Sequence, residues 1–329
     1  MRYLKFLYLA IGLGLLVLVL GETDIADVSE RVIQVGWGLA VIFGLYLIAF
    51  TIDSFTWQMA LVEVPLNGVW MYRTWKARMV GEVFNTVMPA AGMGGEPVKA
   101  ILLKKYYGIG YREGTASLIL GKTINMASLM IFLIGGFVLM WSAPALPLSY
   151  KFVSGLGLLT LGMGIGLFFI IQRLKITSIT GAWIGRRRIG AWVNGVVHHI
   201  HDMDERLVRF YTQHKRRFAG AVMLALVNWL LGAAEVYYSM LFLGHPISLA
   251  DAWIIEAAAQ LVRAGAFFIP AGIGIQEGVF FVVCSAMTGV PALGVAVAVV
   301  RRIREALWLA WGTLLGFMFT LMPEHEAAK

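Results

Sequence analysis

The chain alternates long runs of apolar residues with short polar connections. Several of these runs approach the roughly 20 residues that an α-helix needs to cross a bilayer, and few charged residues interrupt them. The pattern therefore predicts an all-α, polytopic membrane protein. The predicted membrane-spanning helices cover Leu4–Leu20, Ile33–Asp53, Thr115–Trp141, Phe152–Ile171, Phe218–Leu243 and Ala292–Thr320.

Two further apolar stretches, near 79–103 and 252–287, are interrupted in the middle by proline and glycine. Proline removes a backbone donor and breaks the helical hydrogen-bond ladder, so neither stretch is a single straight helix. Each is either a re-entrant hairpin or a pair of short helices that cross the membrane completely. In both cases the chain returns to the same side, so the predicted topology does not depend on this choice.

Composition supports a membrane protein. Hydrophobic residues make up 59% of the 329 residues and charged residues 14%, whereas soluble domains carry about 25% charged residues. The net charge of +8 comes from basic residues between apolar runs, which favours an anionic membrane surface over nucleic acid as partner. Cys284 is the only cysteine, which excludes an internal disulfide and any cysteine-based zinc or iron–sulfur site. We expect no cofactor.

Charges at the ends of the apolar runs predict the orientation. Arg2 and Lys5 precede the first run as in a signal peptide, but no small-x-small cleavage site follows, which favours an uncleaved helix. Basic residues concentrate on one side, so the positive-inside rule predicts a multi-pass inner (plasma) membrane protein with both termini in the cytoplasm. These basic residues are Arg73, Lys76, Arg78, Lys104, Lys105, Arg112, Arg173, Lys175, Arg186, Arg187, Arg188, Arg206, Arg209, Lys215, Arg216 and Arg217.

Apolar residues recur at helical spacing in the polar loop 172–217. This spacing predicts an amphipathic helix on the cytoplasmic surface, in contact with anionic phospholipid. Two acid–histidine pairs have metal-ligand spacing, but a helix surface offers no enclosed site, so we expect a solvated face and no metal. The apolar positions are Val196, Ile200, Met203, Leu207 and Phe210, and the pairs are His198 with Asp202 and His201 with Glu205.

The two broken segments have similar sequences. Pro89 precedes Glu96 by seven residues, and Pro270 precedes Glu277 by the same interval. Glycines between them let the backbone turn sharply, and backbone exposed at membrane depth requires protein, water or substrate beside it. The helix-breaking residues are Pro89, Gly92, Gly94, Gly95, Pro270, Gly272 and Gly274, and Gln276 immediately precedes the second glutamate.

The similarity extends beyond the broken segments. Asp53 lies 36 residues before the first proline and Glu235 lies 35 before the second. Downstream, Lys122 follows the first glutamate by 26 residues and Arg302 follows the second by 25. Three predicted spans separate the segments, and an odd number inverts the second unit relative to the first. The sequence therefore predicts an inverted repeat, with units 1–141 and 142–329, an arrangement common among transporters.

These landmarks supply the candidate transport residues. Each glutamate would open the second half-helix, where an acid suits the positive end of the dipole, and the basic residues would pair with it or with a substrate phosphate. The alternative is that these pairs only hold the hairpins, or that Asp53 and Glu235 are interfacial. We also expect an ion pair between Glu82 and Arg263. The candidates are Glu96, Glu277, Lys122, Arg301, Arg302, Arg304, Asp53, Glu235, Arg263 and Gln276.

The motifs of the two broken segments resemble those of a known family. The segment Asn85–Lys99 with its Gly-Gly-Glu-Pro, the following Lys122-Thr123, and Pro270–Gly278 resemble the lysylphosphatidylglycerol synthase transmembrane-region family, the flippase-like half of the MprF proteins. The similarity spans nearly the whole chain. Full MprF proteins add a soluble aminoacyl-transferase domain, whereas this chain stops at Lys329. The resemblance implies lipid translocation without lipid synthesis, as in stand-alone, hopanoid- or glycolipid-associated members.

The sequence favours a lipid flippase or translocase that moves an anionic, glycosylated or polyprenyl lipid between leaflets. Gly121-Lys122-Thr123 lacks the upstream glycine of a P-loop, so movement would be downhill or coupled to ions, not driven by ATP. The alternatives are an intramembrane lipid-modifying transferase and an ion-coupled small-solute transporter. No catalytic constellation is recognisable, and the symmetric glutamates argue against a one-sided active site. The sequence leaves homo-oligomerisation open.

Overall fold

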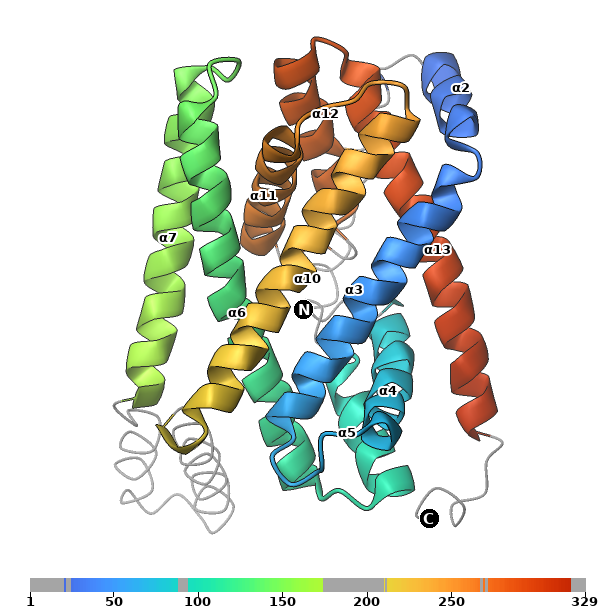
Figure 1. The fold of residues 1–329 in the computed structure, drawn as a ribbon, viewed down its shortest axis with the longest axis vertical. Helices are drawn as coiled ribbons and strands as arrows, with labels where there is room; N and C mark the ends of the chain where they lie inside the picture. Colours follow the sequence, from blue (N-terminus) through green and yellow to red (C-terminus); the bar gives the residue numbers. More distant parts are fainter. Residues whose placement is uncertain are drawn as a thin grey trace, which may run out of the picture.

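The computed structural model describes residues 21, 25–87, 94–173, 210, 212–266, 269 and 272–320. Within these ranges it has ten helices and no β-strand, which confirms the predicted all-α polytopic membrane fold (Figure 1). Four helices are long and apolar enough to cross a membrane: α3 (Gly38–Ala60), α6 (Tyr111–Ser142), α7 (Leu148–Arg173) and α10 (Lys215–Phe242). Helix α13 (Pro291–Thr320) also runs over much of the molecule's height, but a charged cluster lowers its hydropathy.

The predicted span Ile33–Asp53 is misplaced. Helix α2 (Ile25–Val35) is separate, and α3 begins at Gly38 and continues to Ala60. The cause is Gly36, whose φ of 51° is a left-handed conformation that ends a helix. Asp53 is consequently inside α3 and 9% exposed, not at a span end. The predicted span Leu4–Leu20 and positions 174–209 of the predicted amphipathic loop lie outside the described residues.

Both broken segments form pairs of short helices. Helices α4 (Gly68–Val87) and α5 (Glu96–Tyr107) lie together at the lower end of the molecule in Figure 1, whereas α11 (Leu249–Gly265) and α12 (Ile275–Thr288) lie together at the upper end. Each pair begins and finishes at the same end, and the last turn of α4 and of α11 lies nearer to mid-height. Pro89, Gly92 and Pro270 fall outside the described residues.

The two groups of four helices make equivalent contacts. In one, α3 packs on α4, α4 on α5 and α5 on α6; in the other, α10 packs on α11, α11 on α12 and α12 on α13. The groups interlock because α3 packs on α10, α6 on α11 and α13 on α4. Helices α5 and α12 both end at left-handed glycines, Gly108 (φ 70°) and Gly289 (φ 73°). The order, contacts and caps of the first group therefore recur in the second.

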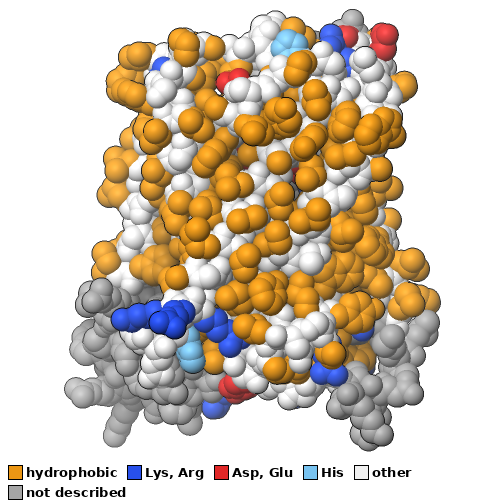
Figure 2. Space-filling view, in the orientation of Figure 1, with side chains coloured by type: hydrophobic (Ala, Val, Ile, Leu, Met, Phe, Trp, Pro, Cys, Tyr) orange, Lys and Arg blue, Asp and Glu red, His pale blue; other side chains and the backbone are white. Residues whose placement is uncertain are grey.

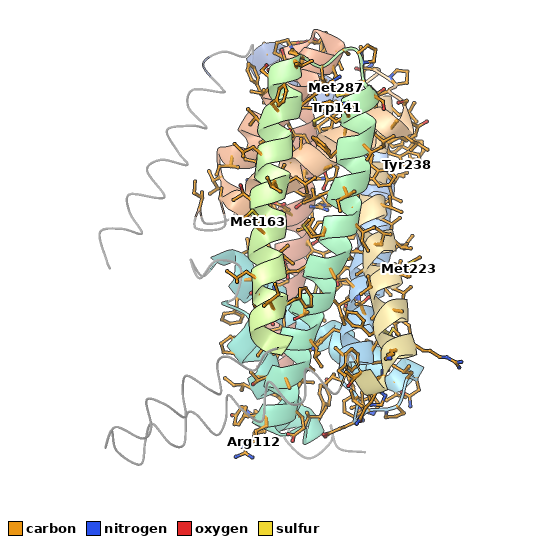
Figure 3. The ribbon with its side chains drawn as sticks, turned by 90° about the vertical axis from the view of Figure 1, so that its left-hand side faces the viewer. Arg112, Trp141, Met163, Met223, Tyr238 and Met287 are labelled. Carbon is orange, nitrogen blue, oxygen red and sulfur yellow. The ribbon has the colours of Figure 1, made fainter. Side chains whose placement is uncertain are left out.

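The outer surface suits lipid. Hydrophobic side chains cover the middle of the face in Figure 2, and Lys and Arg gather towards the lower end. Figure 3 places Arg112 at the lower end of α6 and Trp141 at the upper end, so this helix covers the full height. Its 32 residues correspond to about 48 Å. Helix α7 packs on α6 and α11 and exposes Leu156, Met163 and Leu167. A shell of this kind is stable in hydrocarbon, not in water.

Helices α4 and α5 approach each other through backbone. The Gly95 amide donates to the Asn85 side-chain oxygen at 2.7 Å, which ties the start of α5 to α4. A Cβ atom added at Gly95 would overlap the Gly81 carbonyl oxygen. No side chain can move aside to relieve this overlap, because the obstacle is backbone. The first hairpin therefore requires glycine at position 95.

We expect Gly95→Ala to lower the free energy of unfolding by about 1–3 kcal/mol, the usual cost of overpacking. The thermal unfolding midpoint in detergent measures this loss. Gly164→Ala on α7 is the matched control, because nothing lies within 4 Å of its added Cβ. An unchanged midpoint in Gly95→Ala would show that the hairpin separates easily.

Candidate functional site: a charged central cavity

A cavity of about 520 Å³ lies between the two helix groups. Its lining comes from the middle of α3, α6, α10 and α13, from the inner ends of α4 and α11, and from Ala266, Ile269, Gly272 and Ile275 between α11 and the start of α12. The volume falls within the roughly 300–1,000 Å³ typical of small-molecule sites. The polar lining residues are Arg78, Glu82, Asn85, Thr86, Lys122, Asn125, Asn228, Glu235, Glu256, Gln260, Arg263, Arg301, Arg304 and Glu305.

Two arginines of α13 pair with acids on the neighbouring helices. Arg301 Nη2 lies 2.8 Å from Glu256 Oε2 on α11, and its Nε lies 3.5 Å from Glu235 Oε1 on α10. Arg304 Nη1 lies 2.8 Å from Glu235 Oε2. Both arginine side chains are at most 7% exposed. Buried charges of this kind are tolerated only when they are paired and hydrogen-bonded, so α10, α11 and α13 are locked together electrostatically.

The pairing continues to the second hairpin. Arg304 Nη2 lies 3.6 Å from Glu305 Oε1, and Arg302 Nη1 lies 2.9 Å from Glu305 Oε2. Arg302 Nε in turn lies 2.7 Å from Glu277 Oε1. The other oxygen of Glu277 accepts the Gly274 amide at 2.9 Å, where φ is 79°, and so caps α12. One chain of ion pairs thus joins the cavity wall to the hairpin turn.

The first helix group has a smaller charged cluster. Asp53 on α3 pairs with Arg78 on α4. Glu96, the first residue of α5, lies 3.3 Å from Lys122 Nζ on α6 and 3.1 Å from Lys99 Nζ, both measured from its Oε1 atom. The Lys122 side chain remains 43% exposed, whereas that of Lys99 is 7% exposed. Lys122 therefore presents its ammonium to the cavity from a position that Glu96 fixes.

The predicted ion pair of Glu96 with Lys122 is present, and Glu277 pairs with Arg302, one of the three α13 arginines that were candidates for it. The structure does not place every candidate on the cavity wall, however. Helix α5 contributes no lining residue, and the wall omits Asp53, Glu96, Glu277, Gln276 and Arg302. Glu96 belongs to α5, whereas the other four lie on α3, α12 and α13, which contribute different residues to the wall. Lys122, Glu235, Arg263, Arg301 and Arg304 do line it.

Sequence reasoning misplaced Arg78, predicted an ion pair that the described residues do not form, and overlooked two side chains. It assigned Arg78 to the cytoplasmic loop charges, but Arg78 is inside α4 and lines the cavity. Glu82 and Arg263 line the same cavity, yet no ion pair joins these two described residues. Glu256 and Glu305 were overlooked. An ionisable residue within an apolar stretch is a functional candidate by default, and this signal applies to both.

Aromatic side chains complete one wall. The Arg304 guanidinium carbon lies 3.7 Å from the Tyr46 ring centroid, a cation–π contact. Tyr46 meets Trp308 edge-on, with ring centroids 4.8 Å apart. Trp308 is 2% exposed and packs with Phe50 and Met79. This aromatic wall therefore packs against the Arg304 guanidinium on the cavity lining.

Comparison with known proteins identifies the family. A family model described as the lysylphosphatidylglycerol synthase TM region matches residues 5–312. The chain belongs to this family. The match to the lysylphosphatidylglycerol synthase TM region includes every helix that lines the cavity, in agreement with the resemblance of the two broken segments.

Two curated relatives cover most of the chain. A UPF0104 membrane protein of Methanothermobacter thermautotrophicus is 23% identical over 314 residues, covering 89% of this chain and 88% of the relative. A UPF0104 membrane protein of Pyrococcus horikoshii is 24% identical over 333 residues, with 96% of each chain covered. No solved structure was found to match. Both relatives are named as membrane proteins, in agreement with the membrane fold of this chain.

Proposed function

We propose that this protein is a lipid translocase whose central cavity carries a lipid headgroup between leaflets. One observation carries the proposal: a charged cavity of about 520 Å³ lies inside an apolar shell, between two helix groups of equivalent order. A path for a polar headgroup needs polar lining at a depth where hydrocarbon would exclude it. The acyl chains of the lipid would remain in the apolar surroundings.

The hairpins supply the moving parts of this proposal. If the long axis in Figure 1 lies along the membrane normal, α4–α5 re-enters from one face and α11–α12 from the other. Equivalent elements facing opposite leaflets allow alternating access, in which each hairpin opens the cavity to its own side. The accumulation of Lys and Arg at the α4–α5 end would place that end in the cytoplasm (Figure 2).

The family membership supports a lipid as the substrate. The matching family model is described as the TM region of lysylphosphatidylglycerol synthase, a name that refers to a lipid product. The sequence contains no P-loop, which supports downhill or ion-coupled movement over direct ATP drive.

Filling the cavity tests this function. We expect Asn228→Trp, which places an indole in the cavity lining, to slow lipid movement by at least roughly tenfold, equivalent to about 1.4 kcal/mol on the barrier. The measurement is leaflet exchange of headgroup-labelled lipids in proteoliposomes. Met223→Trp on the same helix is the matched control, because Met223 is 60% exposed on the outer surface (Figure 3). Lipid exchange no faster than in protein-free liposomes would contradict the proposed function.

A further inference from the structure

Two charged residues of the cavity differ from all the others. Glu82 on α4 and Arg263 on α11 line the cavity, and neither is in an ion pair with any residue that the structure describes. The other charged lining residues all have ion-pair partners. Glu82 lies seven residues before Pro89 and Arg263 seven before Pro270. Equivalent positions of the two helix groups thus carry opposite charges.

The surroundings of these two side chains differ. Glu82 is half-buried, beside the Asn85 amide and within the field of Arg78, Lys99 and Lys122. Arg263 is exposed at the inner end of α11, which reaches mid-height in Figure 1. A guanidinium facing hydrocarbon at that depth is costly. Arg263 therefore belongs at a polar mouth of the cavity, where an incoming anionic group would meet it.

The charges around the cavity balance. The lining residues, their ion-pair partners and the next partners along these networks, Lys99 and Glu277, comprise seven basic and seven acidic side chains, so the net charge is zero. A site with no net charge in a poorly polarisable interior does not compensate a guest that carries a net charge. The basic residues are Arg78, Lys99, Lys122, Arg263, Arg301, Arg302 and Arg304, and the acidic residues are Asp53, Glu82, Glu96, Glu235, Glu256, Glu277 and Glu305.

We propose that the cavity selects a zwitterionic headgroup, with its phosphate at Arg263 and its ammonium at Glu82. A guanidinium binds phosphate through two parallel hydrogen bonds, and a carboxylate accepts hydrogen bonds from an ammonium. A headgroup that carries both charges pairs both side chains and adds no net charge. An anionic headgroup leaves Glu82 unpaired, and an uncharged sugar headgroup pairs neither residue. The inference rests on the proposed function and specifies its substrate class.

Equilibrium binding of short-chain lipids to the purified full chain tests the headgroup directly. The probes are phosphatidylethanolamine, phosphatidylglycerol and a glucosyl-diacylglycerol. We expect phosphatidylethanolamine to bind at least roughly tenfold more tightly than either of the others, because only it pairs both charges. Glu82→Gln and Arg263→Gln should each weaken phosphatidylethanolamine binding by about tenfold. Glu82→Gln should also make the affinities for phosphatidylethanolamine and phosphatidylglycerol more similar.

A charge exchange provides the decisive variant. Glu82→Arg combined with Arg263→Glu restores one site for each charge, so it should bind phosphatidylethanolamine more tightly than either glutamine variant. Lys151→Gln is the control, since Lys151 is outside the cavity and donates to the Trp141 carbonyl oxygen. Circular dichroism of each variant reports its fold. If a glutamine variant does not fold, the headgroup preference of the wild type and of the charge exchange decides.

Two results would overturn the inference. In the first, the wild-type protein binds phosphatidylglycerol or the glycolipid more tightly than phosphatidylethanolamine. In the second, the glutamine variants bind all three lipids more weakly by the same factor. The second result would assign both residues a structural role only. Failure of the proposed function gives a different result, namely selective phosphatidylethanolamine binding without movement of lipid between leaflets. Movement of all three lipids at one rate would contradict the headgroup inference alone.

Discussion

Replacing Arg301 with methionine is expected to lower the free energy of unfolding by about 3–5 kcal/mol, the cost of leaving a buried charge without its partner. Arg301 pairs with Glu256 and Glu235 across α10, α11 and α13, and its side chain is 6% exposed. Methionine fills similar space but supplies no donor. Among the residues that the structure describes, Glu256 would keep only the Gln260 amide as a hydrogen-bond partner, whereas Glu235 would keep Arg304.

A double variant separates the loss of charge pairing from the loss of packing. Arg301→Met combined with Glu256→Met removes both partners of the 2.8 Å ion pair, so it should recover much of the lost stability. Thermal unfolding midpoints in detergent provide the measurement. Arg31→Gln is the control. The Arg31 side chain, which pairs with Asp27, is 30% exposed, and ion pairs at the surface contribute only about 0–1 kcal/mol to stability. Equal midpoints for the single variant and the wild type would show that water already enters this cluster.

Glu96→Gln and Glu277→Gln are each expected to slow lipid movement by at least about tenfold while the protein remains folded. Neither carboxylate lines the cavity, so both are positioning residues. Glu96 fixes Lys122, which does line it, and Glu277 holds Arg302 beside the chain of ion pairs that includes Arg304. Glutamine keeps the shape and an oxygen that can accept the Gly274 amide, so the substitution tests charge and not volume.

The double variant distinguishes one transport cycle from two independent structural pairs. If both hairpins act in the same alternating-access cycle, Glu96→Gln with Glu277→Gln should be little slower than the slower single variant. Independent effects would add. Leaflet exchange in proteoliposomes and the unfolding midpoint are measured in parallel, with Glu30→Gln on the exposed face of α2 as control. Loss of exchange that only follows a loss of stability would assign both glutamates to the hairpin structure alone.

The sequence by itself determined the fold class and the main landmarks. Apolar runs long enough to span a bilayer arise from composition and period, which are local properties. They predicted α6, α7, α10 and α13 closely. The equal spacing of proline and glutamate in the two broken segments likewise predicted where the helical pairs α4–α5 and α11–α12 occur. The same spacing predicted Lys122 as the partner of Glu96 and limited the partner of Glu277 to three arginines, of which Arg302 is the one that pairs with it.

Local boundaries were less predictable where one glycine decides them. The apolar run from Ile33 gives no sign that the chain bends at Gly36, because φ of a glycine is set by its surroundings and not by hydropathy. The resulting shift moved Asp53 from a predicted span end to the interior of α3. Arg78 was assigned to a loop for a different reason, because the predicted broken segment began only near residue 79; it lies inside α4 and is the partly buried partner of Asp53.

Only the tertiary structure decided which charged residues share the cavity. Glu256, Glu305 and Arg78 come from three helices that are distant in sequence, and no spacing rule relates them. Glu82 and Arg263 line the cavity, whereas Glu96 and Glu277 do not. The physical reason is that burial of a charge depends on which other helices surround it. Sequence periodicity fixes the face of a helix, but packing between helices determines what that face meets.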